Sequence, residues 1–439
     1  MTRSALTLAL AAVMAASMWC YADFILVPYE VADAARNGRP RGNLSDLYPR
    51  WWGAHELLLH GRDPYSAEVT REIQTGYYGR PLDSARRTDP KDQQGFAYPI
   101  FVVLLLAPTV KLSFATVALL FRWLLVLLIV GSVALWLAAL GWLISTEAVL
   151  VASLLVLGSF PAVQAIKLEQ LTALVSFLLA GCAAALVMRR LALAGFLLAL
   201  ATIKPQLAMP LAVWLTVWAI GDFRSRQRFL WSFLATLATL VAAGEILLPG
   251  WIGRFRTALR AYLEYAGGTS LFDLALGPTG GRAMAIVVIV AVGVWCWRWR
   301  RVRADSEIFG WTLSIVLTAI LSVIPTFAPY NQLLLIPALV LIFQRGLRRT
   351  KAKPLARLTL SFVVLAIGLP WLATLGLDGA LLVLPQAVVE RAWSVPLWTS
   401  WFIPFSVLAA LVVCVLEVKK EPTTSLPRQT QPVALLAIL

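Results

Sequence analysis

The run FATVALLFRWLLVLLIVGSVALWLAAL, residues 114–140, decides the fold. It carries a single charged residue, Arg122, and it exceeds the ~20 apolar residues that a transmembrane helix needs. In the whole chain, apolar residues make up 60% of the 439 positions and charged residues 14%. A water-soluble domain of this length could not bury so much apolar surface in one core. We therefore predict that lipid surrounds most of the chain.

Apolar runs of this kind recur along the chain and predict an all-α, polytopic transmembrane bundle with about 12 spans. Irregular backbone cannot cross the lipid, because unpaired N–H and C=O groups there cost several kcal/mol each. The first run, 5–27, is longer than the apolar region of a usual cleavable signal peptide, so we expect an uncleaved first helix. The other runs lie near 114–140, 148–165, 171–188, 191–203, 207–220, 229–248, 283–297, 308–325, 333–343, 358–375 and 397–416.

Basic clusters between these runs predict the topology, because Lys and Arg accumulate on the cytoplasmic side of a membrane. With the chain in the inner (cell) membrane and both termini in the cytoplasm, every cluster falls on that side. The formal charge of +15 is then a topology signal, and we expect no nucleic-acid partner. The clusters are Arg189 and Arg190; Arg224, Arg226 and Arg228; Arg298, Arg300, Arg301 and Arg303; 345–357; and Lys419 and Lys420.

This topology divides the chain into four parts. Residues 1–27 form the first transmembrane helix, 28–113 a large external loop with interfacial helices, 114–416 the transmembrane bundle and 417–439 a cytoplasmic tail. The apolar stretch 97–110 must then be re-entrant rather than a full span, since it is short and contains Pro99 and Pro108.

A second external segment, 249–282, predicts a helix that lies in the membrane surface. One face is aromatic and apolar and the other is basic. The apolar face holds Trp251, Phe255, Leu259 and Tyr262, and the basic face holds Arg254, Arg256 and Arg260.

The clearest local pattern of the first loop is NLSDLYPRWWGAHELLLHGRDPY, residues 43–65. It predicts a short helix that Ser45 or Asp46 caps and that Gly61 with Pro64 ends. Its buried stripe would consist of Leu47, Trp51, Ala54 and Leu58. Asp46 would stand where lipid-borne groups arrive, so its carboxylate could be a general base or simply a helix cap.

Further motifs follow in order along the chain. They are GFAYP at 95–99 with its apolar continuation to Pro108, Gln170 ahead of a predicted helix, and IKPQ at 203–206. Together with the helix that begins at Asp46, these motifs resemble glycosyltransferase family 87 from Asp46 to Ala338. Members of that family are polyprenyl-phosphate-sugar-dependent membrane transferases of GT-C type.

The resemblance implies a hexosyltransferase that moves a sugar from a polyprenyl-phosphate carrier to an acceptor hydroxyl on the extracytoplasmic side, with inversion. Mannose is the first candidate, because it is common in the family. The aspartate that begins the first-loop helix, here Asp46, is the implied catalytic base. The implied partners are the polyprenyl-phosphate-sugar donor, a lipid or glycan acceptor and membrane lipids, and no cofactor is implied.

Candidate substrate-binding residues are polar groups in these motifs and charged groups in apolar surroundings. Lys204 interrupts two apolar runs and is the first candidate for holding a phosphate, unless it snorkels to the interface. Arg122 either lines that site or reaches the lipid headgroups. The stretch 325–333 lacks the histidine that relatives often carry there, so Asn331 or Gln332 can hydrogen-bond a sugar or phosphate but brings no positive charge. The full set is Lys204, Gln170, Gln206, Tyr98, His55, Arg122, Arg282 and Asn331.

No metal site is predicted. His55 and His60 are the two histidines, and neither has another histidine, a cysteine pair or a tight acidic cluster at ligand spacing. The aspartates Asp83, Asp89 and Asp92 could bind a divalent cation together with the phosphate, but scattered acidic residues in a loop are more often only solvated.

Two other function classes compete with a transferase. A lipid or solute transporter or flippase would explain the many spans and Lys204, but it predicts inverted repeats, and none is visible. A sugar polymerase or ligase of O-antigen type would carry its large external loop late in the chain, whereas this loop follows the first helix.

Overall fold

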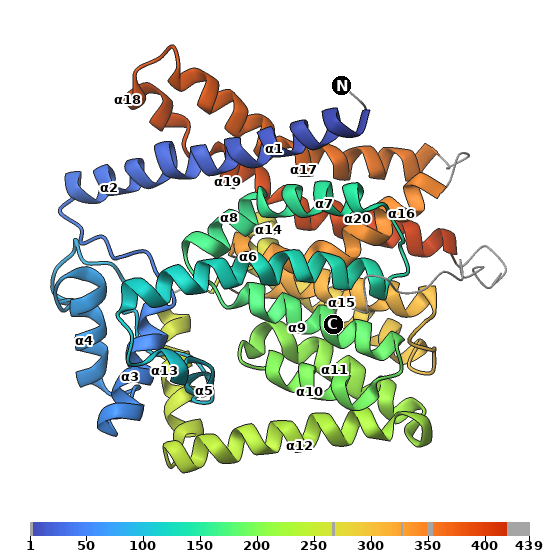
Figure 1. Cartoon of the computed structure of the whole chain (residues 1–439), viewed down its shortest axis with the longest axis horizontal. Helices are drawn as coiled ribbons and strands as arrows, with labels where there is room; N and C mark the ends of the chain where they lie inside the picture. Colours follow the sequence, from blue (N-terminus) through green and yellow to red (C-terminus); the bar gives the residue numbers. More distant parts are fainter. Residues whose placement is uncertain (1–2, 266–267, 326–327, 349–353, 419–439) are drawn as a thin grey trace.

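The computed structural model describes residues 3–265, 268–325, 328–348 and 354–418, so the predicted tail lies almost wholly outside the described residues. Within these ranges the chain forms helices, turns and loops, and no β-strand. Figure 1 shows long helices running along the long axis of the molecule and shorter helices crossing them at one end. The all-α prediction is confirmed.

The elements are listed here in chain order. They are α1 (Arg3–Tyr21), η1 (Ala22–Leu26), α2 (Val27–Arg36), α3 (Tyr48–His60), α4 (Ala67–Tyr78), α5 (Val102–Leu106), η2 (Ala107–Thr109), α6 (Phe114–Ala139), α7 (Thr146–Leu157), α8 (Phe160–Lys167), α9 (Thr172–Val187), α10 (Leu191–Ala201), α11 (Pro205–Gly221), α12 (Phe223–Leu247), α13 (Trp251–Tyr265), α14 (Leu271–Arg298), α15 (Glu307–Val323), η3 (Pro329–Leu335), α16 (Ile336–Arg348), α17 (Pro354–Leu381), α18 (Gln386–Val389), η4 (Glu390–Ala392), α19 (Val395–Ser400) and α20 (Phe402–Val418).

Several helical segments have the length and composition of membrane spans. Six qualify alone, and the pair α7 and α8, bent by 63°, makes a seventh if it is one span. Four more apolar helices, α9, α10, α11 and α15, have only 10–17 residues. By length alone the structure therefore gives six or seven spans, and the predicted number of about 12 depends on the shorter helices. The six are Ser4–Arg36, Phe114–Ala139, Phe223–Leu247, Leu271–Arg298, Arg357–Leu381 and Gln386–Leu416.

The outer surfaces of these helices are apolar. Leu127 on α6 is 69% exposed and Ile246 on α12 is 83% exposed, and many other large apolar side chains point outward as well. In α14 only 11% of the most apolar window is buried inside the protein. Soluble proteins rarely expose apolar patches of this extent, so these surfaces fit a lipid environment.

Close helix contacts depend on small residues. A Cβ at Gly195 of α10 would lie 2.3 Å from the carbonyl oxygen of Phe229 and 2.7 Å from the backbone nitrogen of Phe233, both on α12. Only glycine permits this approach, which is a typical use of small residues between membrane helices.

The helices of the first loop gather at one end of the bundle together with α13, and in Figure 1 they run across the long helices. The first helical segment continues through η1 and α2 to Arg36 before this loop begins, beyond the boundary expected at residue 27. The stretch 97–110 contains two short helices, α5 and η2, which together are too short to span a membrane. The helix predicted in the segment 249–282 is confirmed as α13, with Trp251 buried and Arg254, Arg256 and Arg260 exposed. Its position in the membrane surface stays a prediction.

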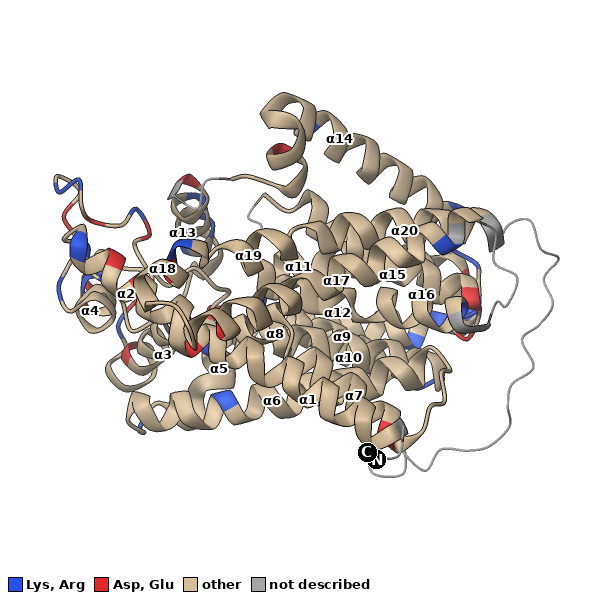
Figure 2. Cartoon of the chain, turned by 90° about the horizontal axis from the view of Figure 1, so that it is seen from above, with Lys and Arg blue, Asp and Glu red and all other residues tan. Residues whose placement is uncertain are grey.

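Basic segments gather at the opposite end. Figure 2 shows them between α14 and α15 and near α16, far from α2 and α4. Here Arg226 is buried at the start of α12 and donates hydrogen bonds to the carbonyl oxygens of Arg300, Arg301 and Val302. This arginine joins α12 to the turn after α14.

Candidate active site

Asp46 lies just before α3 and does not cap it. The cap position is Leu47, which has no side-chain cap hydrogen bond, and the Ser45 hydroxyl donates to Glu169 instead. The backbone N–H of Asp46 donates to the carbonyl oxygen of Leu168 at 2.9 Å. The predicted cap is therefore wrong, and the carboxylate is free for another role. The predicted end of the helix is confirmed, because Gly61 has the left-handed conformation that ends it.

A chain of hydrogen bonds connects Asp46 with Lys204. The Gln170 Nε2 amide donates to Oδ2 of Asp46, and the Gln170 Oε1 accepts from Nζ of Lys204 at 3.0 Å. The three residues are far apart in sequence, and they come from the loop before α3, the turn before α9 and the turn before α11. The fold thus holds a carboxylate and an ammonium on opposite sides of one neutral amide.

Lys204 is only 4% exposed, so the alternative that it snorkels to the interface is wrong. It lies in the turn between α10 and α11, and its Nζ also donates to Oγ1 of Thr172 at 2.7 Å. The Tyr330 ring lies 4.8 Å from Nζ, within the range of a cation–π contact. Burial, reinforced by the charge of Arg50, lowers the pKa of Lys204 to about 7.

A second cation, Arg50, lies one helical turn after Asp46. Its guanidinium carbon is 4.4 Å from the centre of the Tyr98 ring. Its Nε is buried and has no hydrogen-bond partner among the described residues. Asn331 is linked to these residues through Thr172, whose hydroxyl donates to Oδ1 of Asn331 at 3.1 Å. We call this group the cluster; its members are Asp46, Arg50, Tyr98, Gln170, Thr172, Lys204, Tyr330 and Asn331.

The carboxyl of Asp46 responds to these surroundings. Burial raises its pKa above the usual range of an aspartate, because the charged form loses hydration. The positive charges of Arg50 and Lys204 oppose this shift, while Asp92 adds to it. The group is a carboxylate that can accept a proton more readily than a solvated aspartate does.

A family model for glycosyltransferase family 87 matches residues 96–329, which is more than half of the chain. The chain belongs to glycosyltransferase family 87. No curated protein and no solved structure matches it. The matched range is narrower than the resemblance expected from Asp46 to Ala338. It includes Tyr98, Gln170 and Lys204. Asp46 and Asn331 lie outside it, and only their hydrogen bonds to Gln170 and Thr172 connect them with the cluster.

Arg122 of this family 87 protein lies beside the cluster and has a partner of its own. Its Nε donates to Oε1 of Glu169 at 2.8 Å, and the carboxylate of Glu169 is fully buried. Glu169 also accepts from Ser45 and adopts a left-handed φ of 53°. Because Glu169 precedes Gln170, the ion pair with Arg122 supports the turn that presents the Gln170 amide to Asp46.

Three predicted residues of the family 87 chain lie away from the cluster. Gln206 is exposed on α11, and Arg282 is exposed on α14, where its charge acts on Asp273. His55 lies on α3 with its ring stacked on Trp52, 5.0 Å between the ring centres.

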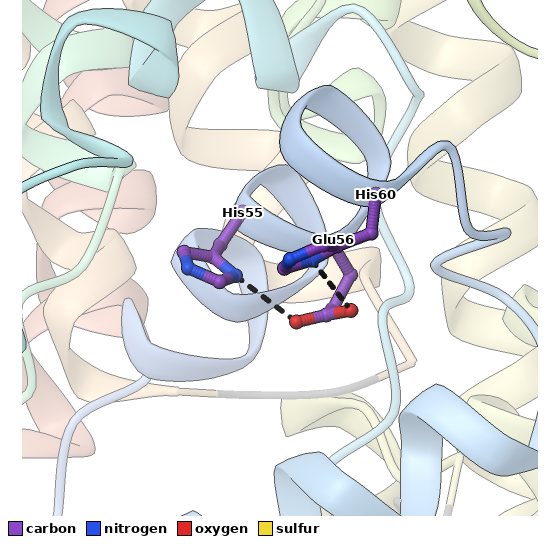
Figure 3. A group of neighbouring side chains, drawn as sticks. All are labelled: His55, Glu56 and His60. Atoms are coloured by element: carbon purple, nitrogen blue, oxygen red, sulfur yellow. Dashed lines mark hydrogen bonds and ion pairs between the residues drawn. The ribbon is translucent and has the colours of Figure 1, made fainter.

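His55, Glu56 and His60 form a small group of potential metal ligands, shown in Figure 3. Their ligand atoms all lie within 4.8 Å of one another. The carboxylate of Glu56 already accepts from Arg62 at 2.8 Å, as well as contacting Nδ1 of each histidine. The negative charge is thus matched by an arginine, and the sequence-based expectation of no metal site stays a prediction.

Sequence reasoning missed three members of the cluster: Arg50, Thr172 and Tyr330. Arg50 lies in the first turn of α3, and Asp46 lies two residues before this helix. Thr172 and Tyr330 are within two residues of Gln170 and Asn331. All three lie within four residues in sequence of a residue that the motifs had singled out.

Proposed function

We propose that this family 87 glycosyltransferase is a GT-C-type enzyme. In this proposal it transfers a hexose, with mannose the first candidate, from a polyprenyl phosphate to an acceptor hydroxyl on the extracytoplasmic side, with inversion. Family membership supports a glycosyltransferase in general. The finer assignment draws on one observation, the hydrogen-bonded chain from Asp46 through Gln170 to Lys204.

Asp46 is the proposed general base. The acceptor oxygen attacks the anomeric carbon from the face opposite the lipid phosphate, and Asp46 takes its proton as the new bond forms. The bond between the anomeric carbon and the phosphate oxygen breaks, and its electron pair stays with the phosphate. Gln170 fixes the orientation of the Asp46 carboxylate through its amide.

Lys204 is the proposed ligand of the leaving phosphate. Negative charge develops on the phosphate oxygen as the bond breaks, and a buried ammonium placed beforehand stabilises that charge more than water does. Thr172 and Gln170 hold the ammonium by its hydrogen bonds. Asn331 and Tyr98 are further substrate contacts in this proposal, and Arg122 supports the site through Glu169.

The proposed topology has about 12 spans, in which α9, α10, α11, α15 and α16 cross as short helices. The first loop faces the extracytoplasmic side of the inner membrane and both termini are cytoplasmic. In support, the basic segments lie at the opposite end from the helices of the first loop (Figure 2).

The reaction class is tested with a panel of radiolabelled donors and the purified full chain in lipid nanodiscs. The panel contains polyprenyl-phosphate hexoses, a polyprenyl-diphosphate sugar and nucleotide sugars, with membrane lipids and glycans as acceptors. We expect transfer from a polyprenyl-phosphate hexose and an inverted linkage in the product. Transfer only from a nucleotide sugar or a diphosphate-linked sugar would overturn the proposal.

A further inference from the structure

Arg50 differs from the other buried or half-buried arginines of this protein. Arg226 donates to backbone carbonyls, Arg62 binds the carboxylates of Glu56 and Glu72, and Arg41 binds that of Glu30. Arg50, in contrast, has no ion pair among the described residues, and its Nε donates to nothing. Its contacts are with Tyr98, through the face of the ring and a side-chain hydrogen bond. A guanidinium with few fixed partners has donors left for a ligand.

Arg50 and Lys204 are two cations close to the same carboxylate. Both favour the ionised form of Asp46, and the charge of Arg50 disfavours the charged form of Lys204. Each cation lies over an aromatic ring, Tyr98 or Tyr330 respectively. The hydrogen bonds of Lys204 go to neutral oxygens of Gln170 and Thr172.

Two like charges gathered in a buried site repel each other unless an anion joins them. Asp46 supplies one negative charge, but its hydrogen bond goes to Gln170. Asp92 supplies a second negative charge near Asp46, and its carboxylate accepts from the backbone and side chain of Gln94. Neither Arg50 nor Lys204 forms a salt bridge among the described residues, so their remaining donors can bind an external anion.

We propose that Arg50 binds the phosphate of the lipid substrate together with Lys204, and that Tyr98 holds the guanidinium in the orientation for this contact. The inference rests on the proposed function, because that function supplies a lipid phosphate. A planar guanidinium matches two phosphate oxygens at once, whereas an ammonium acts as a point charge.

The two cations then have separate roles. Arg50 keeps its charge at every physiological pH, while Lys204 can lose its proton near neutrality. Arg50 thus maintains phosphate binding at alkaline pH, and the ammonium of Lys204 strengthens it at lower pH. Polyprenyl phosphate, the proposed product, uses the same two contacts after transfer.

The test measures binding of farnesyl phosphate, with farnesol as the uncharged reference, to the full chain in nanodiscs. Arg50→Gln removes the charge and Arg50→Lys keeps it, while Arg254→Gln removes an arginine of α13 as the matched control. We expect Arg50→Gln to weaken farnesyl phosphate binding about 10- to 100-fold, as for a lost charge-assisted hydrogen bond, and to leave farnesol binding unchanged. Arg50→Lys should recover part of the loss, and Arg254→Gln should bind as wild type does.

The pH dependence gives a second readout. In Arg50→Gln the remaining binding should fall as the pH rises and Lys204 loses its proton, at a pH above 7, because the charge of Arg50 no longer lowers the pKa of Lys204 and bound phosphate raises it. The wild type should lose less of its binding over the same pH range, because Arg50 stays charged. Equal dissociation constants for wild type and Arg50→Gln, with thermal unfolding confirming both folds, would overturn the inference. Loss of farnesol and farnesyl phosphate binding together would also overturn it, because that result indicates a structural role.

Failure of this inference and failure of the proposed reaction give different results. Arg50-dependent binding of farnesyl phosphate without sugar transfer from any donor would support the anion site and overturn the proposed reaction. Sugar transfer with an unchanged donor KM in Arg50→Gln would overturn the proposed role of Arg50 and support the proposed reaction. Binding of inorganic phosphate as strong as that of farnesyl phosphate would show that the site takes free phosphate rather than a lipid, and would overturn the assignment.

Discussion

At the scale of single residues, replacing the amide nitrogen of Gln170 by an oxygen tests the site most directly. The amide donates to Asp46 with its nitrogen and accepts from Lys204 with its oxygen, so both neighbours depend on one side chain. A glutamate in its place would keep the acceptor but lose the donor and add a negative charge beside Asp46. The buried carboxylates would then repel each other, and one of them would hold a proton at neutral pH.

The rate should therefore fall in Gln170→Glu more than in Gln170→Asn, which keeps the amide but shortens the side chain. We expect kcat to fall about 100-fold or more in the glutamate variant, as when a general base is blocked. Initial rates of transfer at equal protein abundance measure this difference. A glutamate variant with wild-type kcat would show that the amide does not orient the base.

The pH profile follows from the two titrating groups. Asp46 must be unprotonated to accept a proton, and its pKa is raised, so kcat/KM should rise with pH through a range above that of ordinary aspartates. Lys204 must be charged to hold the phosphate, so kcat/KM should fall above a pKa of about 7. Bound phosphate favours the ammonium, so the alkaline limb of kcat should lie at higher pH than that of kcat/KM.

Lys204→Arg provides the check on the alkaline limb, because arginine keeps its charge throughout this range. The limb near pH 7 should disappear from kcat/KM in an active Lys204→Arg enzyme. Its persistence would assign the limb to another group.

At the scale of elements, the apolar runs located the helices well but did not settle how many of them span the membrane. The apolar runs near 171–188, 191–203 and 207–220 correspond to α9, α10 and α11, yet each helix is shorter than a standard span. The break at Lys204 was visible in the sequence, but hydropathy does not show whether apolar runs as short as these cross a membrane. The helix cap at Asp46 was mispredicted for a related reason, since its actual partner, Gln170, is distant in sequence.

The contact between α10 and α12 gives a stability prediction. Gly195→Ala should lower the melting temperature, because its Cβ would collide with the backbone of Phe229 and Phe233, and overpacking costs about 1–3 kcal/mol. Gly293→Ala on α14 is the matched control, since a Cβ there meets nothing within 4 Å. Alanine favours the helix, so the control should melt at the same temperature or higher. Equal melting temperatures for both variants would contradict this packing.

At the scale of the whole molecule, charge separates the two ends. The external loop carries both signs, while basic residues gather at the far end of the bundle (Figure 2). The positive-inside rule then predicts that the first loop faces outward. The sequence alone supported this orientation, because the clusters lie between the apolar runs in a regular order.

Cysteine labelling tests the orientation in a Cys20→Ser background, because Cys20 is exposed. Arg87→Cys places a thiol in the first loop and Gln227→Cys places one near the start of α12, and both positions are exposed. We expect a membrane-impermeant maleimide to label Arg87→Cys in intact cells and Gln227→Cys only after permeabilisation. The reverse pattern would invert the topology and place the site on the cytoplasmic side.

The most direct test of the central claim is the transfer rate of Asp46→Asn from a polyprenyl-phosphate hexose, compared with wild type and with Asp83→Asn. Asparagine keeps the shape of aspartate and loses the proton acceptor, while Asp83 is exposed in the first loop. We predict that Asp46→Asn lowers kcat at least about 100-fold, with the fold and farnesyl phosphate binding retained, and that Asp83→Asn transfers as wild type does. An Asp46→Asn enzyme as fast as wild type would contradict the claim that Asp46 is the catalytic base.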